Sequence, residues 1–304
     1  MQTLHPEITA LAVPPAQLGE SPFWHPTEQQ LYWIDIPGHT LHRYRPTDGQ
    51  HQHWPLDSEP GSCAPLQGGG LLLAMRDGIW RFDTGSGQRS LLAAPPYDPA
   101  RQRFNDGKAD AQGRLWVGSI DDKRLPDAAL YRLADGKLER MADGITVSNG
   151  LSFSPGGLRM SWADTQAHQI ELFDLDPRDG SLSNRRRWAQ FARRQAAAPT
   201  STAYGGRPDG AAMDAEGGCW VAMFDGQRLL RLAPDGELLT ELPLPVRCPT
   251  MPCFGGADLK TLYITTAQDQ RPADEQAAQP QPLAGCVLQL RLDVPGLAVN
   301  FVRL

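Results

Sequence analysis

The chain has 304 residues, a formal net charge of −6 at pH 7 and a sequence pI near 5.6. This acidic balance argues against nucleic acid or an anionic membrane as the main partner. No apolar run approaches the roughly 20 residues that span a bilayer. The first residues, 1–8, lack a basic segment followed by an apolar one, so we expect no secretory signal and a cytoplasmic protein.

Short apolar runs recur along the chain, and each is followed by a turn and a second, alternating segment. The runs are Leu31–Ile34, Leu71–Ala74, Leu115–Val117, Met160–Ala163, Cys219–Val221 and Leu262–Thr265. The alternating segments are 41–44, 79–82, 130–133, 170–173, 229–232 and 287–290. The spacing of the runs is close to the roughly 40–50 residues of a four-stranded propeller blade. Because no long amphipathic helix pattern interrupts them, the six units predict an all-β fold, a six-bladed β-propeller that forms a single domain over residues 1–304.

The ring of blades must also be closed, and the chain contains two segments that do not fit the repeat. We expect residues 8–13 to pair with strands around 297–299 or 301–302. Residues 185–204 contain five arginines, all within 185–194, for which an anion-attracting lid is one interpretation and a solvated strand with a surface loop is the favoured one. Residues 268–284 are rich in Gln, Pro and Ala, and we expect a mobile loop in the last blade.

Glycine-containing turns and scattered cysteines complete the pattern. Asp-Gly occurs nine times, and it supplies the positive φ of hairpin turns, so we expect several of these pairs between strands. Five cysteines are too few for a disulfide framework. Cys219 is expected to be a small core residue. Cys248 and Cys253 could form a disulfide or join a soft-metal site, but no second Cys/His pair at zinc spacing accompanies them, so we favour reduced thiols.

Four oxygen-bearing side chains precede a strand tryptophan at similar distances. The pairs are Asn105 with Trp116 and Asp209 with Trp220, 11 residues apart, and Glu20 with Trp33 and Asn149 with Trp162, 13 residues apart. Equivalent positions of a repeat that rings an axis come together near that axis, so we expect the four groups to meet. Carboxylate and amide oxygens suit hard cations such as Ca²⁺, Mg²⁺ or Mn²⁺. Any one of them alone would be ordinary turn chemistry, whereas four in phase favour a site.

Other chemistries find less support in the sequence. There is no Gly-x-Ser-x-Gly elbow, no P-loop and no dinucleotide-binding glycine fingerprint. The His51-Gln-His53 pair follows the Asp48-Gly49 turn, and we expect it in a solvated hairpin rather than at a metal.

Five motifs, in this order, resemble the SMP-30/gluconolactonase/LRE family, which includes regucalcin and sugar lactonases. They are Gly19-Glu20-Ser21-Pro22-x-Trp24, Arg103–Lys108 with Gly113-Arg114, Ser148–Leu151, Pro208–Gly210 and Phe254–Gly256, within a resemblance that runs from about residue 11 to 300. The resemblance implies one divalent metal at the mouth of the central channel of the propeller, bound by Glu20, Asn149 and Asp209. Ca²⁺ is the first expectation, with Mg²⁺, Mn²⁺, Zn²⁺ or Fe²⁺ as alternatives. Arg103 and Asn105 match positions that contact the sugar lactone or lie beside the metal.

The resemblance also implies an activity, the metal-dependent hydrolysis of a gluconolactone-like or pentonolactone substrate to its aldonic acid by a monomer or weak dimer. Asp209 matches the catalytic residue and would act as the base, or would orient a metal-bound water that takes this role. Lys123 lies at or beside the position of a substrate-contacting glutamate in regucalcin-like members, so the sugar stays unassigned. Two alternatives remain, a calcium-binding regulatory protein without physiological turnover and an esterase or organophosphatase on the same fold. Arg103 argues against a pure cation site, because a fixed positive charge adds nothing to one.

Overall fold

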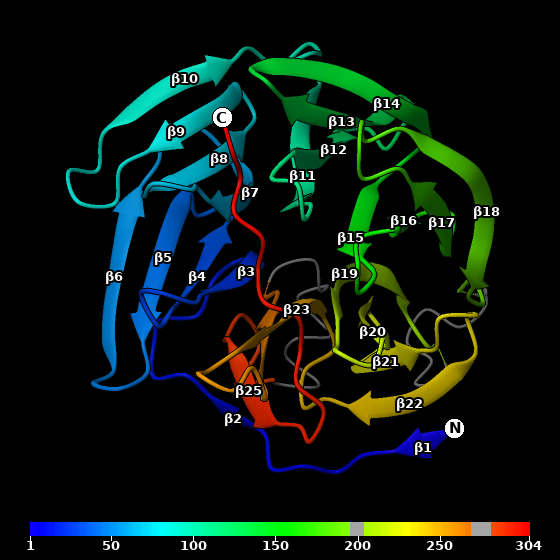
Figure 1. Ribbon diagram of the computed structural model, residues 1–304. Helices are drawn as coiled ribbons and strands as arrows, with labels where there is room; N and C mark the ends of the chain where they lie inside the picture. The colour runs from blue at the N-terminus through cyan, green and yellow to red at the C-terminus, as the bar shows by residue number, and fades with distance from the viewer. Residues whose placement is uncertain (195–203, 269–280) are drawn as a thin grey trace.

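The computed structural model describes residues 1–194, 204–268 and 281–304. Within these ranges the regular elements are β-strands, which form six sheets around a central axis (Figure 1). No helix in the described ranges has the length and apolar character needed to cross a membrane. The sequence prediction of an all-β, six-bladed propeller is confirmed.

Each of the first three blades is a meander of four antiparallel strands whose first strand lies nearest the axis (Figure 1). The first contains β3 (Gly19–His25), β4 (Gln30–Asp35), β5 (Thr40–Arg45) and β6 (Gln50–Pro55). The second contains β7 (Pro60–Pro65), β8 (Leu71–Met75), β9 (Gly78–Phe82) and β10 (Arg89–Ala93). The third contains β11 (Gln102–Ala109), β12 (Leu115–Asp121), β13 (Ala128–Ala134) and β14 (Lys137–Ile145).

The last three blades repeat this order, and the N-terminal segment adds a strand to two of them. The fourth blade contains β15 (Ser148–Phe153), β16 (Arg159–Asp164), β17 (Gln169–Leu175) and β18 (Leu182–Gln190). The fifth contains β19 (Arg207–Met213), β20 (Cys219–Phe224), β21 (Arg228–Leu232) and β22 (Leu238–Pro243), with β1 (Gln2–Thr3) as a fifth, parallel strand. The sixth contains β23 (Pro249–Gly255), β24 (Thr261–Thr266), β25 (Leu288–Arg291) and β2 (Thr9–Ala10).

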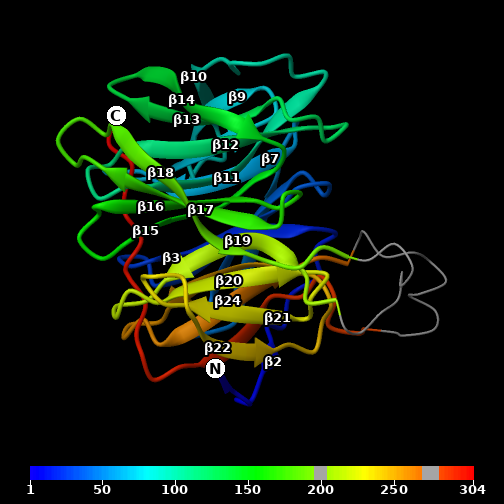
Figure 2. The same cartoon turned by 90° about the vertical axis from the view of Figure 1, so that its right-hand side faces the viewer.

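The ring is closed by the N-terminal strand, but its partner differs from the predicted one. Thr9 lies opposite Gln289 and Ala10 opposite Leu288, so β2 pairs with β25 and not with residues 297–302. The reason is that the described residues at the C-terminal end give the last blade three strands, β23, β24 and β25, and the outer edge of β25 is open to β2. The C-terminal segment instead crosses one end of the ring (Figures 1 and 2), where Val302 bridges Leu66 at the end of the second blade's inner strand.

The predicted apolar runs are the second strands of the blades, and the alternating segments are the third strands. The second strands are covered on both faces by neighbouring blades, and every residue of β4, β8, β12 and β20 is buried. Large side chains such as Trp33, Trp116 and Trp162 fill the space between blades. Cys219 is fully buried in this layer, and Cys253 is a free thiol and forms no disulfide with Cys248, as expected.

The arginine-rich segment forms an outer, solvated strand. Arg185 and Arg186 lie on β18, where they form ion pairs with Glu171 at 2.6 Å and Asp174 at 2.8 Å on the neighbouring strand. The prediction of a solvated strand is therefore confirmed. The loop expected to follow it, and most of the loop expected at 268–284, fall at 195–203 and 269–280, outside the described residues.

Candidate metal and substrate site

The predicted site residues lie near the beginnings of four inner strands, each beside a β-bulge. One extra residue is inserted relative to the second strand between Glu20 and Phe23, Phe104 and Gly107, Asn149 and Ser152, and Pro208 and Ala211. Bulges re-aim side chains and are common next to active sites. Because these strands all run in the same direction along the axis, the bulges meet at one end of the channel. The C-terminal segment crosses the other end (Figure 2).

Glycines that follow the polar residues allow the inner strands to approach one another. A Cβ atom on Gly107 would overlap Ser62 of the second blade, and one on Gly210 would overlap Met251 of the sixth. Asp106-Gly107 and Asp209-Gly210 are therefore inner-strand pairs and not hairpin turns. The expectation for Asp-Gly holds elsewhere, for example at Asp48-Gly49 between β5 and β6.

Arg103, Asn105 and Asn149 are joined by hydrogen bonds. The Arg103 Nη1 donates to Asn105 Oδ1 at 2.6 Å, and the Asn105 amide donates to Asn149 Oδ1 at 2.5 Å. The Asn149 amide in turn donates to the Thr165 hydroxyl at 2.8 Å, and that hydroxyl donates to the carbonyl of Pro208. This chain of contacts fixes the orientation of both amides, and it links blades three, four and five.

Two carboxylates of the predicted set, Glu20 and Asp209, share the same channel end and repel each other. Burial raises the pKa of Asp209 to about 8, and the negative charge of Asp106 adds to the shift. Burial also raises the pKa of Glu20 well above its usual value, with Asp209 and Asp106 as further causes. The positive charge of Arg103 opposes both shifts. The structure thus brings Glu20, Arg103 and Asp209 into one electrostatic environment.

Asp106 is a member of this carboxylate group that the sequence analysis did not select. Its side chain is 5% exposed, one oxygen accepts a hydrogen bond from the amide of Leu151 at 2.9 Å, and the other oxygen has no partner. Burial raises its pKa, while Lys108 on the same strand opposes the shift. Asp106-Gly107 is one of the nine Asp-Gly pairs, several of which the sequence predicts in turns. Its position inside the polar motif that begins with Arg103 was the signal that could have identified it.

The electrostatics of the site fit a bound cation. Among the described residues, neither Glu20, Asp209 nor Asp106 has a basic side chain within 4.0 Å. Buried carboxylates of this kind are costly unless a positive ion neutralises them. In the same described ranges, no group of three or more His, Cys, Asp or Glu side chains is arranged to hold a metal. A cation at this place would therefore also need the amide oxygen of Asn149.

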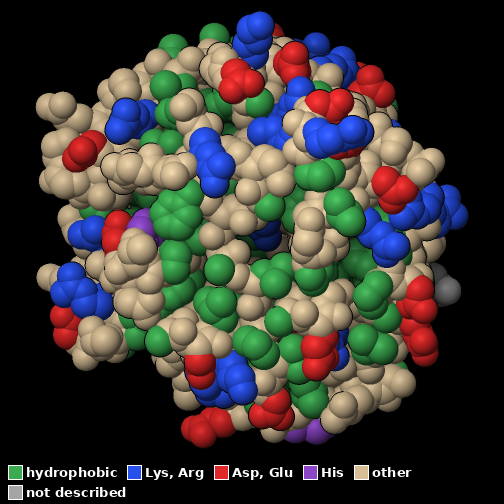
Figure 3. All heavy atoms as spheres, viewed as in Figure 1, with side chains coloured by type: hydrophobic (Ala, Val, Ile, Leu, Met, Phe, Trp, Pro, Cys, Tyr) green, Lys and Arg blue, Asp and Glu red, His purple; other side chains and the backbone are tan. Residues whose placement is uncertain are grey.

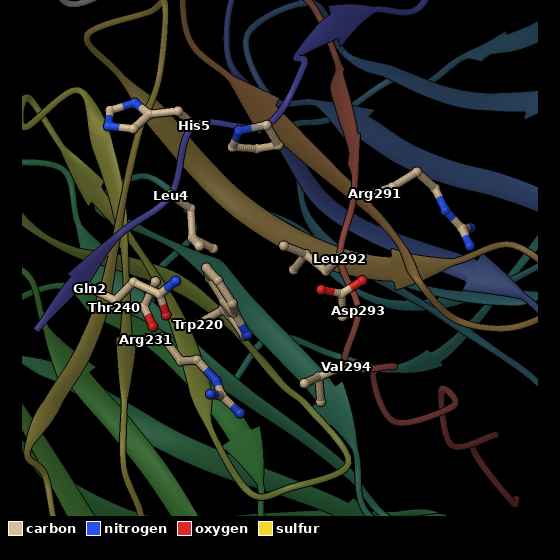
Figure 4. A pocket seen from close by; sticks show the side chains of 11 residues that line it. Gln2, Leu4, His5, Trp220, Arg231, Thr240, Arg291, Leu292, Asp293 and Val294 are labelled. Carbon is tan, nitrogen blue, oxygen red and sulfur yellow. The ribbon is translucent and has the colours of Figure 1, made fainter.

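Two cavities lie away from these carboxylates. One, of about 390 Å³, lies beside the N-terminal segment and is lined by residues such as Leu4, Trp220 and Arg231 (Figure 4). The other, also about 390 Å³, is at the end of the channel that the C-terminal segment crosses, where the surface is hollowed at its centre (Figure 3). Lys108 lines this second cavity. Neither contains a predicted site residue.

Comparison with known proteins places the chain in a family. A family model described as the SMP-30/Gluconolactonase/LRE-like region matches residues 18–268. The chain belongs to this family. The resemblance that the sequence motifs indicated is thus confirmed. The six-bladed ring with its polar channel end is the form that the family fold takes in this chain.

Individual relatives align with nearly the whole length of this chain. A 6-deoxy-6-sulfogluconolactonase of Pseudomonas putida is 42% identical over 286 residues, which are 93% of this chain and 94% of the relative. Regucalcin of Sus scrofa is 33% identical over 288 residues, 92% of each chain. Among solved structures, regucalcin from Agrobacterium tumefaciens, described as a calcium-binding protein, superposes with a TM-score of 0.91 at 26% identity over all of both chains.

Proposed function

We propose that this chain is a divalent-metal-dependent sugar lactonase that hydrolyses an aldonolactone to the open aldonic acid. The observation that carries the proposal is the meeting of Glu20 and Asp209, which lack ion-pair partners among the described residues, with an ordered Arg103–Asn105–Asn149 network at one channel end. The Pseudomonas relative is named for a sulfonated gluconolactone, which supports a lactone substrate.

Glu20, Asn149 and Asp209 are the proposed metal ligands. Two carboxylates and an amide oxygen are a hard, all-oxygen set, which suits Ca²⁺ first and Mg²⁺ or Mn²⁺ next. The Asn149 amide nitrogen donates to the Thr165 hydroxyl at 2.8 Å, and the amide oxygen accepts from Asn105, so the second lone pair of that oxygen is what remains for the cation. The name of the Agrobacterium regucalcin structure, a calcium-binding protein, supports the same choice.

The bound cation would act as a Lewis acid toward the lactone carbonyl. Hydrolysis adds one water to the carbonyl carbon, breaks the ring C–O bond and yields a carboxylate, a hydroxyl and one proton. Asp209 is the proposed acceptor of the proton from the attacking water, because it is a buried carboxylate at the channel end with no competing ion pair in the described residues. Its charge is regenerated when that proton passes to solvent.

Arg103 and Asn105 are the proposed substrate contacts. Arg103 is 8% exposed and is held by its bonds to Asn105 and to the carbonyl of Phe104 at 2.9 Å. A guanidinium fixed in this way can donate its other N–H groups to ring oxygens without a further loss of side-chain freedom. Both residues would orient the lactone and favour the negative charge that develops on it during attack.

A pH-indicator assay of metal-stripped protein tests the proposal. Each divalent ion is added back in turn with glucono-, galactono-, xylono- or arabinonolactone, and acid release is compared with the spontaneous rate. We expect metal-dependent hydrolysis, and we expect Asp209→Ala to lower kcat/KM by about 100-fold or more, as for loss of a general base. The matched control is Asp258→Asn. Asp258 is an exposed carboxylate paired with Arg291, so this variant should keep the wild-type rate.

The same assay separates the lactonase from the alternative of a calcium-binding protein. Metal binding by calorimetry with no hydrolysis of any lactone above background would contradict the lactonase and favour the binding protein. Hydrolysis of aryl esters or organophosphates in place of lactones would favour the third candidate. Hydrolysis that survives complete metal removal would contradict the role of the cation.

A further inference from the structure

Three arginines from two blades stand around the same channel end. Arg103 is near the start of β11, Arg124 is in the connection between β12 and β13, and Arg207 is the first residue of β19. Arg124 lies close enough to both of the others for their positive charges to act on one another. Arg103 is buried, Arg207 is partly exposed and Arg124 is exposed, so the three form a path from the site to its rim.

Arg103 and Arg124 have no close carboxylate partner in the described residues, and Glu59 acts on Arg103 and Asp122 on Arg124 only at longer range. Within the described part of the chain, neither has a carboxylate oxygen within 4.0 Å. The Arg124 Nη1 donates instead to the backbone carbonyl of Asp121 at 3.1 Å, and Arg103 bonds to an amide and a carbonyl. Burial lowers the pKa of Arg124, Asp122 opposes the shift, and the charge of Arg207 adds to it.

Arg207 shares one carboxylate with two other arginines. Its guanidinium lies 3.6 Å from Asp225, which also pairs with Arg194 at 3.5 Å and Arg247 at 3.2 Å. The Arg207 Nε is buried without a hydrogen-bond partner in the described residues. In the described residues, the carboxylate that pairs with Arg207 is therefore one that it shares with other arginines.

Such a group of positive charges is unfavourable by itself, and an anion would relieve it. Guanidinium groups recognise phosphate, sulfonate and carboxylate through paired, charge-assisted hydrogen bonds. In an overall acidic protein, two arginines without an ion pair in the described residues, beside a third that shares its carboxylate, favour an anion at that opening.

We propose that Arg103, Arg124 and Arg207 bind an anionic substituent of the substrate, so that the preferred substrate is a sugar lactone with a phosphate, sulfonate or carboxylate at the end remote from the lactone carbonyl. This inference rests on the proposed lactonase function and deepens it. Arg103 serves both the lactone ring and the substituent, whereas Arg124 and Arg207 are specificity residues at the rim.

Steady-state kinetics of the metal-loaded enzyme test the proposal with matched lactones. The neutral substrate is glucono-1,5-lactone, and the anionic ones are its 6-phospho and 6-deoxy-6-sulfo derivatives and glucaro-1,4-lactone. We expect kcat/KM for at least one anionic lactone to exceed that of the neutral one by about tenfold or more. The member of the panel with the highest kcat/KM identifies the anion.

Variants of the rim arginines decide whether these residues cause the preference. Arg124→Gln and Arg207→Gln should each lower kcat/KM for the preferred anionic lactone by about 10- to 100-fold, mainly through KM, as for loss of a charge-assisted hydrogen bond. The loss for glucono-1,5-lactone should be much smaller. Arg124→Lys should restore part of the preference, and raised salt should weaken it. Arg186→Gln, on the outer strand β18, is the control of equal charge and should match the wild type.

Two results would overturn the proposal. Equal kcat/KM for neutral and anionic lactones would remove the preference, and an equal loss on both substrates in Arg124→Gln would make that residue structural. If no lactone is hydrolysed, the proposed function fails. Calorimetry of the metal-loaded protein with 6-phosphogluconate and gluconate then decides whether the anion site exists. Tighter binding of 6-phosphogluconate that is lost in Arg124→Gln supports the anion site, whereas equal binding contradicts it.

Discussion

Two regions of this molecule bury aspartates in opposite ways. At the turns that lead into β12 and β20, Asp110 and Asp214 are completely buried and fully bonded. Asp214 accepts hydrogen bonds from two backbone amides, from the Trp220 indole at 3.1 Å and from Arg231 at 2.7 Å. Asp110 makes the same set of contacts with two amides, Trp116 and Arg114. These carboxylates stabilise the blades by joining their turns to neighbouring strands.

At the opposite end of the inner strands, Asp106 and Asp209 are also buried, with 5% and 6% of their surface exposed, but lack such partners in the described residues. Asp106 leaves one oxygen without a hydrogen bond, and the pKa of Asp209 is raised to about 8 by burial and by Asp106. The same residue type in the same two blades is thus stabilising at one end of the channel and destabilising at the other. The difference indicates which carboxylates serve the fold and which serve a ligand.

The largest effect is expected from Asp209→Asn, which should separate activity from stability. The variant should lose about 100-fold or more of kcat/KM, because the proposed base and one ligand are removed. Its metal-free free energy of unfolding should equal or exceed that of the wild type at pH 8, because an uncompensated buried charge is gone. Lactone kinetics and urea denaturation measure the two quantities. A large loss of metal-free stability would assign Asp209 to the fold and end the comparison.

Asp214→Asn should give the reverse result. The change removes the charge-assisted hydrogen bonds of a completely buried carboxylate, although Arg231, which is partly buried, keeps Glu216 as a second partner. We expect a loss of about 3 kcal/mol in the free energy of unfolding. The folded variant should keep its lactone kinetics, because the altered turn is at the far end of β19 from Asp209. Urea denaturation checks the first statement. Unchanged stability would show that bonded and unbonded aspartates cannot be told apart by their contacts.

Addition of metal should stabilise the protein only where the unpaired carboxylates are intact. At a cation concentration 100 times the Kd, the wild type should gain about 2.7 kcal/mol of unfolding free energy. Glu20→Gln and Asp209→Asn should gain much less, whereas Asp214→Asn should gain as much as the wild type. Thermal unfolding with and without Ca²⁺ measures the gain. An equal gain in all four proteins would place the cation elsewhere.

The smallest effect is expected from a histidine stack that contains no carboxylate. His42 packs on Trp33 and shares a 3.1 Å hydrogen bond with His51. His51 and His53 lie in the β5–β6 hairpin, as the sequence suggested, with His53 exposed and His51 partly buried. Burial lowers the pKa of His42 to about 3, with His51 and His53 as further causes. The pKa of His42 is lower in the folded protein than in the unfolded chain. Its contribution to the free energy of unfolding is therefore fully present above about pH 6.5 and is lost as the pH falls toward 3.

The expected loss from this stack is at most about 1.5 kcal/mol between pH 6.5 and 5. His42→Phe should keep the stack on Trp33 and remove this pH dependence, whereas His53→Gln, whose side chain is exposed, should not. Urea denaturation across this pH range measures the slope. If the free energy of unfolding of His42→Phe still falls with pH as in the wild type, the pH dependence comes from other groups.

The sequence by itself determined the repeat and the polar cluster. Both follow from local rules, since alternating segments such as 41–44 form strands wherever they occur, and residues at like positions of a ring meet at its axis. The identities of Glu20, Arg103, Asn105, Asn149 and Asp209 as candidates needed no coordinates. Their roles as metal ligands and substrate contacts stay predictions until the kinetics are measured.

Tertiary structure decided what depends on neighbours distant in the chain. The partner of β2 was set by the open edge of a three-stranded last blade, which no local pattern reveals. Asp106 became a site carboxylate because a bulge and a close approach at Gly107 place it beside Asp209 and not in a turn. Arg124 and Arg207 are 83 positions apart in sequence, and their charges act on one another only because their blades face the same channel end. Repetition along the chain fixes the kind of ring, but only the packing of blade against blade fixes which charges lie together inside it.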